Sequence, residues 1–208
     1  MPNILVVVVS CHKNIRLWQS ILLRNQKNTL IICGGFNETS LNGKILQLKC
    51  SDEYEGLSEK MMCAYEFILN HESFNEFTHI LKADDHDTYF VSEQIENIQV
   101  KYKDVLETQD YIGQFLVYNE QLLGRHHHFG KVSKDSIWYN KPYSEKYRPY
   151  LGGGETYILT RKALECLVSQ KQEYPKYFVY EDAMVGALLY NCNIHPYELN
   201  YGIKTWRG

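Results

Sequence analysis

The stretch FTHILKADDHD, residues 77–87, decides the fold class of this chain. Residues 77–83 are mostly apolar, as expected of a buried strand, and three carboxylates follow within four residues. In open α/β sheets, ligands bind just beyond the carboxyl ends of the strands. The stretch therefore predicts an inner strand that ends at a polar, ligand-binding edge of the sheet.

Apolar runs and helical periodicity on both sides of this stretch extend the prediction. Further strands are predicted at residues 3–9, 29–33, 44–50 and 111–117. Helices are predicted from residue 15 and at residues 57–69, 93–106, 160–167 and 177–191, with Thr160 as an N-cap. Strands that alternate with helices in this way predict an α/β fold with a mainly parallel sheet.

Size and charge narrow the class of protein. The 208 residues, 44% hydrophobic and 23% charged, predict one folded domain over residues 1–208 and exclude a disordered chain. The net charge of −3 disfavours a general nucleic-acid partner. We also find no G-x-G-x-x-G, P-loop or G-x-S-x-G motif, which disfavours dinucleotide oxidoreductases, P-loop NTPases and ordinary α/β-hydrolases.

The cellular compartment is predicted from sequence features that the chain lacks. The chain contains no stretch of ~20 apolar residues, so no membrane span is predicted. No secretory signal precedes the first strand. The six cysteines are scattered without a C-x-x-C pair, so we expect reduced thiols and a soluble, cytoplasmic protein.

The acidic turn after the strand is the first candidate site. Asp84, Asp85 and Asp87 repel one another unless a cation or hydrogen-bond donors neutralise them. Hard carboxylate ligands of this kind suit Mg²⁺ or Mn²⁺, which then bridge substrate phosphates. The spacing also fits a solvated acidic loop, and that alternative stays open.

Other segments offer chemistry with equally ordinary alternatives. Glycines 152–154 allow close backbone approach to a ligand or form a tight turn. Asp182, near the start of an apolar helix, is a candidate general base or a stabilising helix-terminal carboxylate. The long polar segment 124–149 predicts a functional loop, with His126, His127 and His128 as incidental or metal-binding residues.

Five motifs, in order, resemble glycosyltransferase family 31, the β1,3-galactosyl- and N-acetylglucosaminyltransferases with their Fringe-type relatives. Residues 51–60 resemble the family's D-S-Y-x-N-L-T-x-K, residues 82–87 its K-x-D-D-D, residues 137–139 with 147–154 its K-W-Y…Y-P-P-Y-x-x-G-G-G, residues 157–160 its Y-V-L-S, and residues 181–186 its E-D-V-Y-V-G. The resemblance covers most of the chain.

The resemblance implies a GT-A fold: a Rossmann-like, three-layer α/β/α domain with a mainly parallel central sheet. Residues from about 1 to 90 would form the nucleotide-binding half, and residues from about 91 to 208 the acceptor half. The implied activity is metal-dependent, inverting transfer of a sugar from a UDP-sugar donor to a hydroxyl of a glycan or glycoprotein. The lack of an evident anchor fits a soluble member from a large DNA virus, acting in the host cytoplasm, or from a bacterium.

The resemblance also assigns roles to individual residues. Asp85, Asp87 and His195, the only histidine after the E-D motif, would bind Mn²⁺ or Mg²⁺, although the family's third Asp aligns with His86. Asp182 would be the catalytic base. The residues implied to contact the nucleotide-sugar are Asp52, Lys60, Asp84, Asp85, Gly153 and Gly154.

Three alternatives remain at this stage. A retaining mechanism would need a nucleophilic carboxylate, for which Glu155 and Glu181 are candidates. A catalytically inactive module could bind a sugar nucleotide or glycan on the same fold. A metal-dependent phosphohydrolase could use the same cluster of aspartates.

Overall fold

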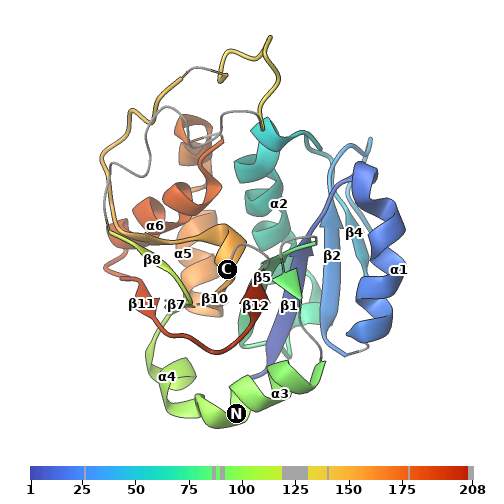
Figure 1. The fold of residues 1–208 in the computed structure, drawn as a ribbon, viewed down its shortest axis with the longest axis vertical. Helices are drawn as coiled ribbons and strands as arrows, with labels where there is room; N and C mark the ends of the chain where they lie inside the picture. The colour runs from blue at the N-terminus through green and yellow to red at the C-terminus, as the bar shows by residue number, and fades with distance from the viewer. Residues whose placement is uncertain are drawn as a thin grey trace.

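The computed structural model describes residues 1–25, 27–85, 88–89, 92–118, 131–139, 141–177 and 179–205. An eight-stranded sheet with the order β11-β7-β10-β5-β1-β2-β4-β3 runs through the molecule, and helices cover both of its faces (Figure 1). The neighbours β5, β1, β2 and β4 are parallel to one another, whereas β10 and β3 run antiparallel to the strands beside them.

The strands of the sheet are short. They are β1 (Ile4–Val9), β2 (Thr29–Cys33), β3 (Ser40–Asn42), β4 (Ile45–Gln47), β5 (His79–Asp84), β7 (Tyr111–Gly113), β10 (Tyr157–Thr160) and β11 (Tyr197–Glu198). Two small sheets pair β6 (Thr88–Tyr89) with β12 (Lys204–Thr205) and β8 (Leu116–Val117) with β9 (Tyr150–Leu151).

The helices form the two outer layers. They are α1 (Ile15–Arg24), α2 (Leu57–Asn70), α3 (Ser92–Lys101), α4 (Lys103–Thr108), α5 (Arg161–Ser169) and α6 (Glu181–Asn191). Short 3₁₀ helices include η1 (His12–Asn14), η5 (Gly153–Glu155) and η6 (Lys171–Lys176). None of the helices within the described residues is both long and apolar enough to span a membrane.

The side chains of β1 show why the chain forms three layers. Leu5, Val7 and Val9 pack into a core with α2, α5 and α6. The alternate residues Ile4, Val6 and Val8 pack into a second core with α1, α3 and α4. A strand buried on both faces is continuously apolar, as this one is. The predicted three-layer α/β/α arrangement with a mainly parallel sheet is confirmed.

Two predicted elements are each divided in the structure. The helix expected over 93–106 breaks at Tyr102, whose backbone (φ −112°, ψ 26°) is not helical, so α4 starts afresh at Lys103. The strand expected over 111–117 becomes β7 and β8, which belong to different sheets. Between them, the Phe115 carbonyl accepts a hydrogen bond from Gly152 (2.9 Å) and thus leaves the large sheet.

Two further predictions were wrong in extent. The strand expected over 44–50 covers only β4, because Gly43 and Lys44 form the turn from β3 and the pairing ends at Gln47. The helix expected from residue 177 begins at Glu181, after the 3₁₀ helix η6, which contains Pro175.

The expectation that all cysteines are reduced was wrong for one pair. Cys166 of α5 and Cys192, just after α6, form a disulfide across 26 residues of sequence. Packing of α5 against α6 brings them together, and neither spacing nor composition shows this contact. Cys11, Cys33, Cys50 and Cys63 are free.

Gly186 lets α6 approach the segment that enters β9. A methyl group at this position would lie 2.4 Å from Cβ of Tyr150 and 2.7 Å from the carbonyl oxygen of Pro149. Such distances are far below van der Waals contact, so any side chain must displace the helix or the strand. The glycine therefore fixes the depth at which α6 packs.

We predict that Gly186→Ala destabilises the protein by about 1–3 kcal/mol, as overpacking of cores does. In an unconstrained helix the same change stabilises by roughly 0.5–1 kcal/mol. The sign of the change in the free energy of unfolding, measured by urea denaturation, therefore distinguishes an overpacked helix contact from an unconstrained one. A variant as stable as the wild type would contradict the packing described here.

Candidate functional site

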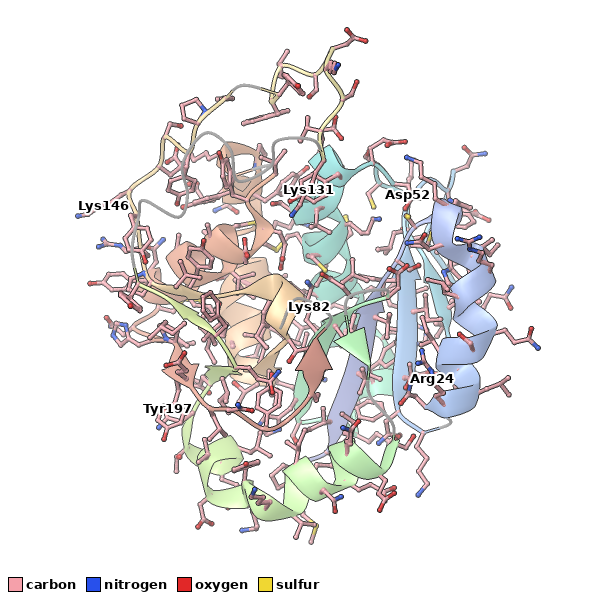
Figure 2. All side chains as sticks on the ribbon, viewed as in Figure 1. Arg24, Asp52, Lys82, Lys131, Lys146 and Tyr197 are labelled. Atoms are coloured by element: carbon pink, nitrogen blue, oxygen red, sulfur yellow. A yellow bond between two sulfur atoms is a disulfide. The ribbon has the colours of Figure 1, made fainter. Side chains whose placement is uncertain are left out.

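A cavity of about 390 Å³ opens where β1 and β5 end. It is lined by the turn after β1, the segment before α2, the end of β5, η5 and the start of α6. The lining residues include four lysines and six carboxylates: Lys13, Lys60, Lys82, Lys131, Asp52, Glu53, Asp84, Asp85, Glu181 and Asp182. Figure 2 labels Asp52, Lys82 and Lys131 on three separate parts of the chain.

Most of the residues predicted for the site line this one cavity. They are Asp52, Lys60, Asp84, Asp85, Gly153, Gly154 and Asp182. Asp87 lies outside the described residues, as do His86 and the histidines 126–128. The roles assigned to all these residues remain predictions, but those described share one site.

His195 is in a different place. It follows the carboxyl end of α6, and its ring contacts Tyr190 with centroids 5.2 Å apart. Asp182 is at the other end of the same 11-residue helix, which is ~16 Å long. The structure thus does not bring His195 to the residues that line the cavity.

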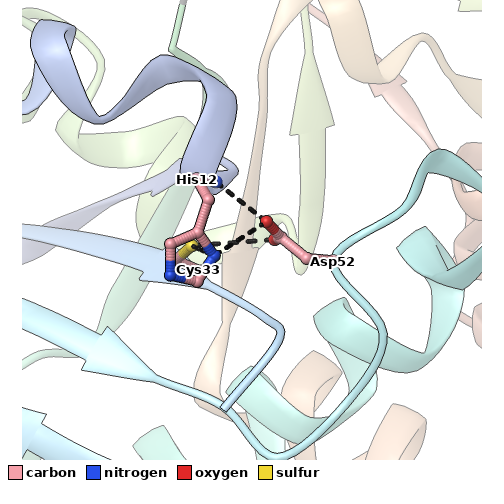
Figure 3. A group of neighbouring side chains, drawn as sticks. All are labelled: His12, Cys33 and Asp52. Atoms are coloured by element: carbon pink, nitrogen blue, oxygen red, sulfur yellow. Dashed lines mark hydrogen bonds and ion pairs between the residues drawn. The ribbon is translucent and has the colours of Figure 1, made fainter.

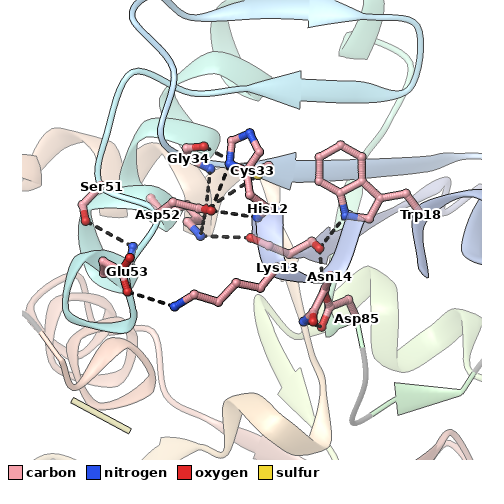
Figure 4. Close-up of polar contacts among 12 residues, drawn as sticks. His12, Lys13, Asn14, Trp18, Cys33, Gly34, Ser51, Asp52, Glu53 and Asp85 are labelled. Carbon is pink, nitrogen blue, oxygen red and sulfur yellow. Dashed lines mark hydrogen bonds and ion pairs between the residues drawn. The ribbon is translucent and has the colours of Figure 1, made fainter. Parts of the chain in front are cut away.

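Asp52, which is partly buried, forms an ion pair with buried Lys60 on one side of the cavity. Figure 4 shows the polar contacts around Asp52. Lys60 Nζ donates to Asp52 Oδ1 (2.8 Å) and to the Ser10 carbonyl (2.9 Å). Although burial acts to raise it, the pKa of Asp52 is lowered, because Lys60 and the backbone amides of His12 and Gly34 stabilise its charge. This carboxylate therefore holds three segments of chain together.

Asp85 is oriented by neutral groups after β1. Its Oδ2 accepts a hydrogen bond from Ser10 Oγ (2.5 Å), and its Oδ1 accepts one from Asn14 Nδ2 (3.2 Å). Trp18 Nε1 in turn donates to Ser10 Oγ (2.7 Å) and fixes the hydroxyl. The side chain of Asp85 is thus positioned at the cavity by residues that add no positive charge.

Lys82 is almost fully buried beneath the glycine turn. Its Nζ donates to Asp84 Oδ1 (2.6 Å) and to the Gly153 carbonyl (2.9 Å). Burial acts to lower the pKa of Lys82, but the charges of Asp84 and Glu181 outweigh it and raise the pKa. A Cβ at Gly153 would lie 3.0 Å from both Lys82 Nζ and Glu181 Oε2, which explains the glycine.

Glu181 is buried beside Lys82, and sequence reasoning gave it only an alternative role. Burial raises its pKa to about 7, with the nearby Asp182 charge adding to the rise and Lys82 opposing it. The Tyr157 hydroxyl donates a hydrogen bond to Glu181 Oε1, and the hydroxyl oxygens of Tyr65 and Tyr157 are 2.7 Å apart. The carboxylate is thus enclosed by tyrosines and one lysine.

Asp182 is partly exposed at the first turn of α6. Its Oδ2 accepts a hydrogen bond from the Gly153 amide (3.3 Å), and its Oδ1 accepts one from the Ala183 amide (3.1 Å). These contacts agree with helix-terminal stabilisation. They also hold the carboxylate at the cavity, where it can accept a proton from a bound hydroxyl.

Comparison with known families identifies the family of this chain. A model of the family described as Galactosyltransferase matches residues 33–200. The chain belongs to the galactosyltransferase family. The matched range includes Asp52, the end of β5 and the Glu181–Asp182 pair. The resemblance to glycosyltransferase family 31 and the α/β fold of GT-A type are therefore confirmed, and the galactosyltransferase-family chain is a glycosyltransferase.

Solved structures similar to this galactosyltransferase-family chain are more distant. A cytidylyltransferase from Leptospira borgpetersenii serovar Hardjo-bovis has 10% identity and a TM-score of 0.49, covering 96% of this chain and 77% of its own. A CMP:2-keto-3-deoxy-manno-octonic acid synthetase complexed with CTP has 9% identity and a TM-score of 0.47, covering 95% and 90%. No curated protein matches the chain in sequence.

We predict that Glu181 makes stability depend on pH. Its folded pKa of about 7 exceeds its ordinary value of 4.5, so its contribution is complete below pH 4.5 and is lost as the pH rises through about 7. The difference in free energy of unfolding between wild type and Glu181→Gln should therefore fall by about 1–3 kcal/mol over this window.

The measurement is urea denaturation at a series of pH values. Glu93→Gln, which alters an exposed carboxylate in the first turn of α3, is the control for loss of a surface carboxylate and should show no comparable fall. A pH-independent difference for Glu181→Gln would show that the buried carboxyl has an ordinary pKa.

Proposed function

We propose that this protein transfers a sugar from a UDP-sugar to a hydroxyl of a glycan or glycoprotein, with a divalent cation and with inversion at the anomeric carbon. The observation that supports this most is the single cavity lined by Asp84, Asp85 and Asp182 together with four lysines. A nucleotide diphosphate needs positive charge, and an attacking hydroxyl needs a base. Residues able to meet both needs lie in the same cavity.

The acidic end of β5 fits a Mn²⁺ or Mg²⁺ ion chemically. Asp84 and Asp85 offer hard carboxylate oxygens at the cavity, and Asp87 follows them in sequence. When bound there, such an ion neutralises the charge that develops on the departing diphosphate. Ser10 and Asn14 hold Asp85 in place for this role.

The lysines would bind the donor's phosphates alongside the ion. Lys13 and Lys131, which are far apart in the sequence, both line the cavity. Lys131 Nζ also lies 5.4 Å from the ring centre of Tyr54. Lys60 and Lys82 are each bonded to a carboxylate, Asp52 and Asp84 respectively. Lys13 pairs with Glu53 at the surface (3.3 Å), and both Lys13 and Lys131 are exposed, whereas Lys60 and Lys82 are buried. We therefore assign the two buried lysines to positioning of the carboxylates and the two exposed ones to the donor.

Asp182 would act as the catalytic base. As the acceptor oxygen attacks the anomeric carbon, its proton passes to Asp182, and the bond from that carbon to the diphosphate oxygen breaks. One base and one direct displacement invert the anomeric configuration. Glu181, which is bonded to Tyr157 and packed beside Lys82, is better suited to hold Asp182 and η5 in place than to attack the sugar.

We predict that Asp182→Asn lowers the rate of transfer by about 10²–10⁴-fold, the usual contribution of a general base, while UDP binding is retained. Asp104→Asn, which changes an exposed carboxylate in the first turn of α4, is the matched control and should leave both unchanged. Transfer to an acceptor panel and UDP affinity are the two measurements. Unchanged transfer by Asp182→Asn refutes the role of this base.

We predict that UDP raises the melting temperature only when Mn²⁺ or Mg²⁺ is present, because ligands that bind the folded state stabilise it by mass action. Asp85→Asn should abolish this shift. Thermal melts with a panel of nucleotide sugars, with and without metal, provide the test and also identify the donor.

The same experiments separate the alternatives. UDP binding without transfer to any acceptor would favour a sugar-nucleotide-binding module. Release of phosphate from UDP or simple phosphoesters without an acceptor would favour a phosphohydrolase. Neither outcome is expected if Asp182 activates a sugar acceptor.

A further inference from the structure

Three potential metal ligands meet beside the cavity, apart from the acidic end of β5. They are His12 in η1, Cys33 at the end of β2 and Asp52 before α2 (Figure 3). Their ligand atoms all lie within 4.8 Å of one another. His12 and Cys33 are not among the residues that line the cavity, so this cluster lies behind Asp52.

Two of the distances within the cluster match edges of a tetrahedral zinc site. His12 Nδ1 is 3.2 Å from Asp52 Oδ2 and 3.7 Å from Cys33 Sγ, and Cys33 Sγ is 3.6 Å from Asp52 Oδ1. Usual Zn–N, Zn–O and Zn–S bond lengths at tetrahedral angles give edges of roughly 3.3 Å for N–O, 3.6 Å for N–S and 3.5 Å for O–S. His12 Nδ1 is thus already spaced as a ligand relative to Asp52 Oδ2 and to Cys33 Sγ. The 3.6 Å contact of Cys33 Sγ is with Oδ1, the oxygen that Lys60 binds, and one ligand atom of each residue lies within 4.8 Å of the others.

The surroundings allow an ion to enter. The His12 side chain is 48% exposed and that of Asp52 16% exposed, so solvent reaches the cluster, while Cys33 forms its buried base. Gly35 (φ +83°) faces the cluster: a Cβ there would lie 3.3 Å from Asp52 Cβ and 3.4 Å from His12 Nδ1. The glycine therefore leaves this side of the cluster without a side chain.

Asp52 can serve an ion while keeping its bond to Lys60. Lys60 Nζ and the Gly34 amide bind Oδ1, whereas Oδ2 is the oxygen that faces His12. A carboxylate has enough lone pairs for an ion at Oδ2 in addition to the His12 amide. The positive charge of Lys60 weakens the site but does not occupy its ligand atoms.

We infer that His12, Cys33 and Asp52 bind Zn²⁺, with solvent as the fourth ligand. One imidazole, one thiolate and one carboxylate suit zinc rather than the hard ions proposed for the acidic end of β5. On binding, the Sγ–H proton passes to solvent as the S–Zn bond forms, and His12 binds through its neutral Nδ1. The ion links the turn after β1, the end of β2 and the segment before α2.

Cobalt replaces zinc in such sites and reports a thiolate ligand directly. Titration of the full chain with Co²⁺, without nucleotide, should produce a sulfur-to-cobalt charge-transfer band that saturates at one equivalent and disappears when Zn²⁺ is added. Co²⁺ bound only to carboxylates, as at Asp84 and Asp85, gives no such band. The readout is thus independent of transferase activity, and it can fail while the proposed function holds.

Two variants and a control assign the ligands. Cys33→Ser should abolish the band, and His12→Ala should weaken Co²⁺ binding by at least roughly tenfold, because loss of even a group that only supports a ligand costs that much. Cys63→Ser, which removes another free, partly buried cysteine, should leave the band intact. No band in the wild-type protein, or a band unchanged in Cys33→Ser, overturns the site. Should Cys33→Ser fail to fold, unchanged Co²⁺ affinity in His12→Ala, where the imidazole is half exposed, overturns it equally.

Discussion

The buried ammonium group of Lys82 is the interaction on which the rest of the site depends. Moving a charge from water into a protein interior costs several kcal/mol, and only well-placed partners offset that cost. Here the partners are Asp84, the Gly153 carbonyl and the nearby charge of Glu181. They come from β5, η5 and α6, so a single cation joins the glycines of η5 to the two elements that bring Asp84 and Asp182 to the cavity.

A second buried lysine performs the same task on the opposite side. Lys60 joins Asp52 to the carbonyl of Ser10, and Ser10 in turn holds Asp85 at the end of β5. Because β1 and β5 are neighbouring parallel strands, their carboxyl ends reach the same edge of the sheet. Two ion pairs thus lie at the cavity of this protein, Lys60 with Asp52 and Lys82 with Asp84. Each supports acidic groups that we propose for metal binding or proton transfer.

Local sequence patterns predicted β1 and β2 well, because a strand buried on both faces must be continuously apolar. The motifs likewise predicted that Asp52, Asp85 and Asp182 belong to one site, and all three line one cavity. What escaped prediction depends on contacts between distant segments. The Cys166–Cys192 bond results from packing of α5 against α6, which leaves no periodic or spacing signal. The burial of Glu181 beside Lys82, and hence its raised pKa, also appears only when α6 packs onto η5.

The disulfide between Cys166 and Cys192 closes a covalent loop that contains Glu181 and Asp182. A single proteolytic cut within this loop, for instance in the exposed part of η6 at Lys171, leaves both fragments attached to each other. Nicked protein would run as one species on a denaturing gel without reductant and as two with it. The acidic end of α6 would also stay tethered to α5 after such damage, so the loop protects the arrangement of the cavity against cleavage.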